Sequence, residues 1–146
     1  MGMILQLAVA TVMVLVTVTI HGGGLALLGK FLRLEARDEI SRHVPALSAR
    51  SLAFTLLLVL ALFALHGVEI WLYALLFLLL GAIGELETAV YFSTIAYAGI
   101  GFGDSYISPD WRLVSGIEGV NGVLLMGWST AFFVTVVTRL GGGYRP

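Results

Sequence analysis

Residues 98–104 combine three glycines in five positions with an aspartate, an arrangement suited to coordinating a cation. Glycine permits left-handed backbone angles, so successive carbonyl oxygens can point to one side and replace the hydration shell of an ion. The aspartate adds one negative charge at the end of the segment. The candidate ion-coordinating residues are Gly99, Ile100, Gly101, Phe102, Gly103 and Asp104.

A second set of polar residues stands within long apolar stretches, where ionisable groups are costly and usually face the protein interior. Glu69 follows His66 by three residues, so both side chains share one face of a helix. These residues predict either a polar network between helices or carboxyl groups hydrated near the end of a span, and a proton relay is a sharper third interpretation. The candidate network residues are His66, Glu69, Glu118 and Asn121.

The composition is that of an integral membrane protein, because 59% of the 146 residues are hydrophobic and 12% are charged. Soluble domains are about 25% charged, and a soluble fold of this size could not bury so much apolar surface. The net charge of −1 gives no basic face for nucleic acid. The absence of cysteine excludes disulfides, thiolate metal sites and cysteine nucleophiles.

No catalytic arrangement stands out in the sequence. No serine shows the spacing of a nucleophile elbow, and His21 and His66 lack a motif that would support haem ligation. We therefore expect a protein that is not an enzyme and that holds neither an organic cofactor nor a metal centre of its own.

Three stretches are long and apolar enough to cross a membrane as helices, which requires about 20 residues. We expect the first, residues 1–29, to be a retained transmembrane helix and not a cleaved signal peptide, because its start carries no positive charge. The others are residues 51–82 and 112–140. The second stretch would be about 46 Å long as one helix, so it must tilt, protrude or break, and His66-Gly67 is the candidate break.

Two other segments separate the spans. Residues 86–97 are apolar but too short to cross, and they lead directly into the glycine-rich residues 98–104. Non-helical backbone at membrane depth must be buried or line a cavity, which predicts a short re-entrant helix followed by an extended loop. Residues 30–50 predict a cytoplasmic amphipathic helix at the interface, ended by Pro45, with a solvated connector as the alternative.

Most basic residues lie between the first two spans or after the third. The positive-inside rule places those segments in the cytoplasm and places the N-terminus and residues 82–112 outside. A re-entrant helix that descends from outside points the negative end of its dipole at the membrane centre. Because one chain cannot surround an ion, we expect a cyclic oligomer in the lipid of the cell membrane.

Residues 94–104, above all residues 101–104 (Gly-Phe-Gly-Asp), resemble the selectivity filter of potassium channels. Residues 91–94 resemble the aromatic pore helix that precedes this filter, and residues 109–112 resemble its junction with the inner helix. The chain is similar to small bacterial potassium-channel-like proteins with a two-helix pore domain, extended by an N-terminal transmembrane helix. The resemblance covers residues 85–140.

The resemblance implies an all-α membrane protein that forms a homotetramer with K⁺ in its filter. The pore domain would comprise residues 51–146, with an outer helix at 51–82, a pore helix at 86–97, a filter-like loop at 98–104 and an inner helix at 112–140. Residues supporting the filter would be Tyr91, Phe92, Thr94 and Ala98. Gly122 and Gly127 would be gating hinges or positions of close packing.

The sequence departs from the filter pattern at its inner end. Ala96, Ala98 and Gly99 stand where threonines that coordinate ions or support the filter are usual, and Phe102 replaces the commoner tyrosine. We therefore expect passive cation transport with altered or weak potassium selectivity. The alternative is a non-conducting membrane scaffold that retains the channel fold.

Overall fold

Four α-helices and one short 3-10 helix make up the part of the chain that the structure describes. The computed structural model describes the backbone of residues 2–42, 49–101, 103 and 105–141, with side chains for residues 2–32, 49, 52–101, 103 and 105–138. These ranges contain no strand, as the all-α prediction requires. The elements are α1 (Met3–Arg42), α2 (Ala49–Leu79), α3 (Leu86–Tyr97), η1 (Pro109–Trp111) and α4 (Arg112–Gly141).

Three stretches of these helices are long and apolar enough to cross a membrane, as predicted. They are Met3–Leu32 in α1, Leu52–Leu79 in α2, and Pro109–Thr138, which joins η1 to α4. The short helix is also found where it was predicted, since α3 begins at Leu86 and ends at Tyr97. Its 12 residues span about 18 Å, which is too little to cross the hydrocarbon core.

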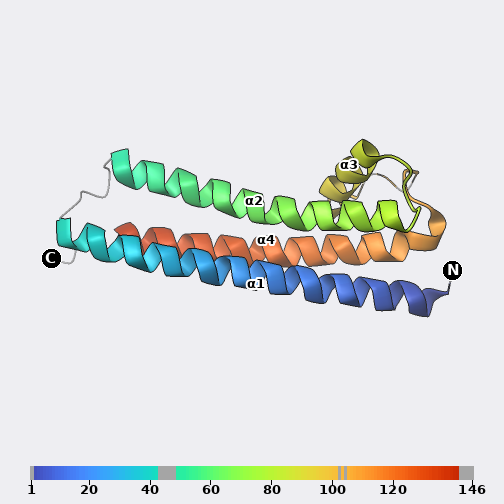
Figure 1. Cartoon of the computed structure of the whole chain (residues 1–146), viewed down its shortest axis with the longest axis horizontal. Coiled ribbons are helices and arrows are strands. Elements are labelled where there is room, and N and C mark those ends of the chain that lie inside the picture. Colours follow the sequence, from blue (N-terminus) through green and yellow to red (C-terminus); the bar gives the residue numbers. More distant parts are fainter. Residues whose placement is uncertain (1, 43–48, 102, 104, 142–146) are drawn as a thin grey trace.

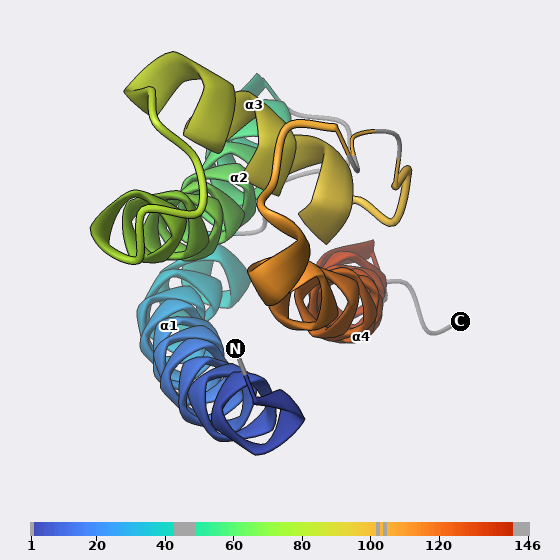
Figure 2. The ribbon, with the colours of Figure 1, turned by 90° about the vertical axis from the view of Figure 1, so that its right-hand side faces the viewer.

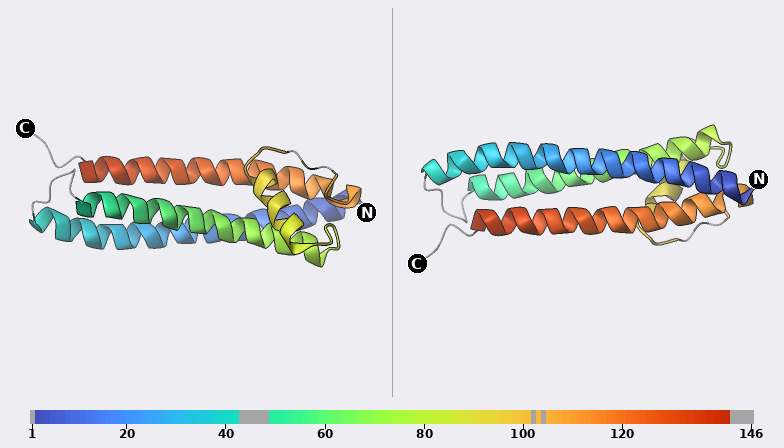
Figure 3. Two further views of the ribbon diagram at one scale, coloured as in Figure 1. Left: turned by 90° about the horizontal axis from the view of Figure 1, so that it is seen from above. Right: turned by 90° about the horizontal axis from the view of Figure 1, so that it is seen from below.

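The three long helices lie side by side along the length of the molecule (Figures 1 and 3). α1 and α4 run in the same direction, and α2 runs in the opposite direction (Figure 1). Seen end-on, they stand at three corners, and α3 lies across α2 and α4 (Figure 2). α3 therefore sits at the end of the bundle where α2 ends and α4 begins.

Two boundaries differ from the sequence-based prediction. α1 is one helix of 40 residues, so residues 30–42 continue it and do not form a separate interfacial helix. α2 is unbroken over 31 residues, so the candidate break at His66-Gly67 is wrong. A glycine within a helix lowers its propensity by about 1 kcal/mol, and packing against α1, α3 and α4 keeps this one helical. Pro45 lies outside the described residues.

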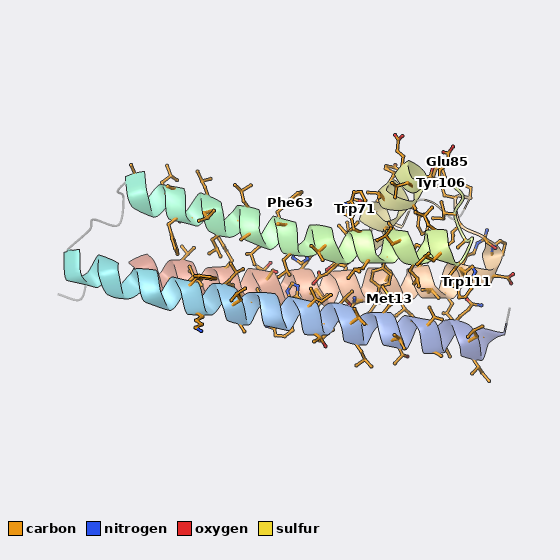
Figure 4. The ribbon with its side chains drawn as sticks, viewed as in Figure 1. Met13, Phe63, Trp71, Glu85, Tyr106 and Trp111 are labelled. Carbon is orange, nitrogen blue, oxygen red and sulfur yellow. The ribbon has the colours of Figure 1, made fainter. Side chains whose placement is uncertain are left out.

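The apolar side chains divide between the bundle interior and its outer surface. Tyr73, Phe77 and Trp111 belong to one buried cluster at the α3 end, and Leu58 and Leu62 belong to a second cluster towards the other end. Phe63 projects outward from α2 and is 77% exposed (Figure 4). Exposed apolar side chains of this kind suit a surface that faces lipid.

Close packing of α3 on α4 depends on glycine. A methyl group at Gly122 would overlap the carbonyl oxygen of Tyr97, the last residue of α3. A methyl group at Gly119 would lie 3.0 Å from the carbonyl oxygen of Ala96. A methyl group at Gly127 would meet no atom of another described element within 4 Å. Gly122 therefore serves close packing, as one of the two sequence interpretations held, while its role as a gating hinge stays a prediction.

We expect Gly122→Ala to lower the free energy of unfolding by about 1–3 kcal/mol, the usual effect of overpacking, because backbone atoms of α3 must move. Gly127→Ala is the matched control. It should be neutral or stabilising by up to about 1 kcal/mol, since alanine is the better helix former. Thermal unfolding of the two variants in the same detergent measures the difference, and equal midpoints would contradict the packing argument.

Candidate functional site

α3 turns one buried face to the bundle and one exposed face away from it. Phe92 is buried against Phe77 of α2, with ring centroids 5.6 Å apart. Tyr91 and Thr94 are exposed, and the Thr94 hydroxyl donates to the carbonyl of Val90 within its own helix at 2.7 Å. Of the four residues predicted to support the filter, Phe92 is therefore the one that lies in the core.

Gly99 ends α3 in a turn that only glycine adopts easily. Its φ angle is +73°, its N–H donates to the carbonyl of Ala96 at 2.9 Å, and the N–H of Ile100 donates to Ile95 at 3.0 Å. This is the Schellman pattern, in which a left-handed residue satisfies the last carbonyls of a helix. A left-handed angle costs a residue with a Cβ about 1–2 kcal/mol, so this backbone favours glycine at position 99.

The chain continues from Gly99 as non-helical backbone with exposed residues. Gly101 also has a left-handed φ of +72°, and Gly99, Ile100 and Gly101 are all exposed. Gly103 is half-buried, and a methyl group there would lie 3.1 Å from the Phe92 ring. The remaining candidate ion-coordinating residues, Phe102 and Asp104, lie outside the described residues.

This segment borders an open groove of about 540 Å³ on the surface of α4. Val120 and Val123 of α4 are more than half exposed there. The groove joins the end of α3, the start of the filter-like segment and one face of α4. Its lining residues are Ala96, Gly99, Gly101, Arg112, Ser115, Gly116, Gly119, Val120, Val123 and Leu124.

A buried polar cluster lies behind α3, on the bundle side. Glu69 of α2 is 0% exposed. One of its carboxyl oxygens is 2.9 Å from Nδ1 of His21 of α1, and the other accepts a hydrogen bond from the hydroxyl of Tyr97 of α3 and lies 3.3 Å from Nδ1 of His66. The carboxyl group thus ties α1 and α3 to α2.

Ser129 of α4 joins the two histidines of this cluster. Its hydroxyl oxygen is 3.2 Å from Nε2 of His21 and 3.0 Å from Nε2 of His66. The Nδ1 atom of His66 is also 3.0 Å from the Tyr97 hydroxyl oxygen. Every helix of the bundle therefore contributes at least one side chain to the cluster.

Asn121 belongs to a second, smaller link. Its amide donates to the Thr17 hydroxyl of α1 at 2.8 Å and to the Tyr73 hydroxyl of α2 at 3.3 Å. It bonds to neither glutamate. The link holds α1, α2 and α4 together nearer to the α3 end, because Tyr73 lies one helical turn beyond Glu69 on α2.

Glu118 is buried without a hydrogen bond. It is 0% exposed, and neither of its carboxyl oxygens has a partner among the described residues. The Ser93 hydroxyl of α3 lies beside it and interacts with it electrostatically, but the geometry of the pair falls short of a hydrogen bond. Of the predicted network residues, His66 and Glu69 come together, Asn121 joins a different link and Glu118 joins none.

Full burial of Glu69 and Glu118 rules out the interpretation in which both carboxyl groups are hydrated at the end of a span.

The sequence-based prediction of a network also omitted five partners that the structure supplies. One signal was present in the sequence: Thr17 and His21 are polar residues one turn apart in an uncharged span, and so share a face. The omitted partners are Thr17, His21, Tyr73, Tyr97 and Ser129.

The sequence model of the ion channel family matches residues 54–139 of the chain. This range holds most of α2, all of α3, the filter-like segment and most of α4, and it is more than half of the chain. The chain therefore belongs to the ion channel family, as its resemblance to two-helix pore domains implied, and it carries α1 as an additional apolar helix. Neither the curated proteins nor the solved structures contain a match.

Family membership and the three candidate spans make this a multi-pass membrane protein with the architecture of an ion channel domain. The family is one of channels and not of enzymes. Channel-like ion transport is accordingly the class of function that the fold supports.

We expect Gly99→Thr, which restores the residue usual in potassium filters, to destabilise the protein by about 1–2 kcal/mol because of its left-handed backbone. The added Cβ would also lie 3.0 Å from Val123. Ala98→Thr is the matched control, since Ala98 has an ordinary φ of −72° and is exposed. Thermal unfolding compares the two, and a loss of stability in Ala98→Thr alone would contradict the assignment.

Leucine at each buried glutamate should have opposite consequences. Glu69→Leu removes the acceptor of His21 and Tyr97 and should cost about 1–3 kcal/mol for each polar group left unsatisfied. Glu118→Leu loses no hydrogen bond and should leave stability unchanged or raise it, because an unpartnered carboxyl group leaves an apolar site. Unfolding midpoints at pH 8 measure both, and equal losses would refute the distinction.

Proposed function

We propose that this chain assembles as a homotetrameric cation channel that passes K⁺ with weak or altered selectivity. The observation that carries the proposal is the exposed, non-helical segment that follows α3 in a member of the ion channel family. Such backbone is tolerated at membrane depth only where it is enclosed by protein or lines an aqueous cavity. K⁺ in the filter is the only bound group that this function requires.

The geometry of α3 supports an ion site at its end. The C-terminal end of a helix carries about half a negative charge, and α3 ends at Tyr97, directly before Gly99 and Gly101. Four copies of this end around an axis would make a cation favourable there. The backbone carbonyls of residues 99–101 are the oxygen ligands that would replace its hydration shell.

The exposed face of α4 supports a symmetric assembly. The groove beside the filter-like segment is lined largely by apolar side chains and glycines. In a cyclic tetramer this face of each chain would meet its neighbours around the pore axis. By the positive-inside rule, the proposed channel lies in the cell membrane with its N-terminus outside and its C-terminus in the cytoplasm.

Weak selectivity follows from the inner end of the segment. Gly99 offers no hydroxyl, and its backbone completes the turn that ends α3. A potassium site built from threonine hydroxyl and carbonyl oxygens is therefore missing its side-chain ligand. The same observation favours the second candidate, a non-conducting membrane scaffold that keeps the channel fold.

Flux through liposomes separates these candidates. Purified protein in vesicles with an outward K⁺ gradient should release K⁺, and replacing the gradient with Na⁺ should give a flux of comparable size. Native mass spectrometry of the same preparation should show four chains. A tetramer without flux would establish the scaffold, and strong rejection of Na⁺ would overturn the weak selectivity.

Two variants test whether the K⁺ flux passes through the filter-like segment. Gly101→Ala places a Cβ on a left-handed residue of the filter-like segment and should reduce K⁺ flux several-fold. Gly84→Ala lies between α2 and α3, has no left-handed angle and meets no atom within 4 Å, so its flux should equal that of the wild type. Equal loss in both variants would show that the flux does not pass the segment.

A further inference from the structure

Five side chains of the buried polar cluster form a closed ring of hydrogen bonds, which we call the polar ring. Glu69 bonds to His21, His21 to Ser129, Ser129 to His66, His66 to Tyr97, and Tyr97 back to Glu69. The two imidazoles use both nitrogens, and the two hydroxyl oxygens each have two partners. Each of the five bonds joins one pair of polar atoms.

With an ionised glutamate and two neutral histidines, the polar ring has one hydrogen fewer than it has hydrogen bonds. Each bond needs one hydrogen between its two heavy atoms. An ionised glutamate supplies none, while a neutral histidine, a serine and a tyrosine supply one each. The two histidines and two hydroxyls therefore supply four hydrogens for five bonds. We propose that the polar ring is a binding site for one additional proton, shared among Glu69, His21 and His66.

The additional proton closes the ring in either of two arrangements. In one, a doubly protonated histidine faces an ionised Glu69, and Ser129 accepts from one imidazole and donates to the other. In the other, a protonated Glu69 donates to His21, His21 donates to Ser129, and each remaining bond follows in the same direction, so that Tyr97 still donates to Glu69. Both arrangements carry no net charge and satisfy every atom of the ring, which is what burial at 0% exposure demands of Glu69.

A divalent metal is the other occupant that this donor set could hold, because ligand atoms of His21, His66 and Glu69 lie within 4.8 Å of one another. The distances favour the proton. Nδ1 of His21 is 2.9 Å from the Glu69 carboxyl oxygen, which is a hydrogen-bond length. Two ligands of a tetrahedral zinc, each about 2.0–2.1 Å from the metal, would stand farther apart.

Few other charged or titratable groups face the ring. Beyond the ring itself, the buried ionisable groups that interact with Tyr97 are Tyr73 of α2 and Glu118 of α4. From α3 only Tyr97 takes part. The Trp128 ring of α4 lies 5.5 Å from His21 and carries no charge. Among the described residues, the hydrogen bonds and ion pairs of the ring include no lysine or arginine, so neither supplies a positive charge to balance an ionised Glu69.

The position of Tyr97 makes this proton relevant to the filter-like segment. Tyr97 is the last residue of α3 and stands two positions before Gly99. Its hydroxyl is held by the ring, and its carbonyl packs on Gly122 of α4. Loss of the proton would leave one bond of the ring unmade and a net negative charge behind α3. The effect on ion flow rests on the proposed function, whereas the proton site does not.

Substitutions of Ser129 test the hydrogen count directly. Ser129→Ala removes two bonds and one hydrogen, so three bonds remain for three hydrogens and the additional proton is no longer required. Ser129→Thr keeps the hydroxyl and should keep the proton. Histidine ¹⁵N spectra and carboxyl infrared spectra at pH 8, in a His43→Gln background, detect a doubly protonated imidazole or a protonated carboxyl group.

The expected result is one such signal in the wild type and in Ser129→Thr, and its loss in Ser129→Ala. Glu118 contributes equally to all three proteins and cancels in the comparison. Glu69→Gln is a second variant: its amide supplies the fifth hydrogen, so the ring closes without an additional proton. The decline of thermal stability with rising pH that we expect of the wild type should be smaller in this variant, with buried Glu118 accounting for the part that remains.

Two outcomes would overturn the proton site. One is identical spectra in the wild type and Ser129→Ala. The other is a stoichiometric divalent metal in the purified wild type by elemental analysis. A protein that shows the proton signal but passes no ions in liposomes would retain the proton site and lose the proposed channel function, so the two failures can be told apart.

Discussion

The burial of one carboxyl group determines much of the arrangement of this molecule. A side chain that is ionised within an apolar bundle needs partners, because an unpaired buried charge costs several kcal/mol. Glu69 meets that requirement with His21 of α1 and Tyr97 of α3, and Ser129 of α4 extends the bonds to the last helix. The hydrophobic effect is non-directional, whereas the hydrogen bonds of this cluster are directional and favour one register of the helices.

The backbone imposes the second requirement, at the end of α3. The end of a helix leaves carbonyl groups without partners, and the turn at left-handed Gly99 brings the N–H groups of Gly99 and Ile100 to them. The missing side chain at Gly122 lets α4 pack directly on the last residue of α3. Two contacts therefore hold Tyr97. The polar ring binds its hydroxyl group, and Gly122 packs against its carbonyl group.

Patterns that are local in the sequence predicted local structure well. The bounds of α3 followed from a short apolar segment before dense glycine, and both ends agree. Partners were harder to predict, because His21 and Glu69 are 48 positions apart and only the packing of α1 on α2 brings them together. The amphipathic pattern of residues 30–42 fits a helix in any orientation, so it could not show that α1 continues through them. For Glu118 the sequence left a buried network and a hydrated position both open, and it could not show that the residue is buried without a hydrogen bond.

The polar ring also has a consequence for the order in which the protein is built. Thr17 and His21 of α1 find their partners on α2 and α4, which are synthesised later. Until those helices are made, the His21 ring lacks the partners that they supply, whereas the Thr17 hydroxyl can still donate to the carbonyl of Met13 within α1. Tertiary structure in this chain can therefore be completed only after the final helix has been inserted, and the first helix depends for its partners on the last.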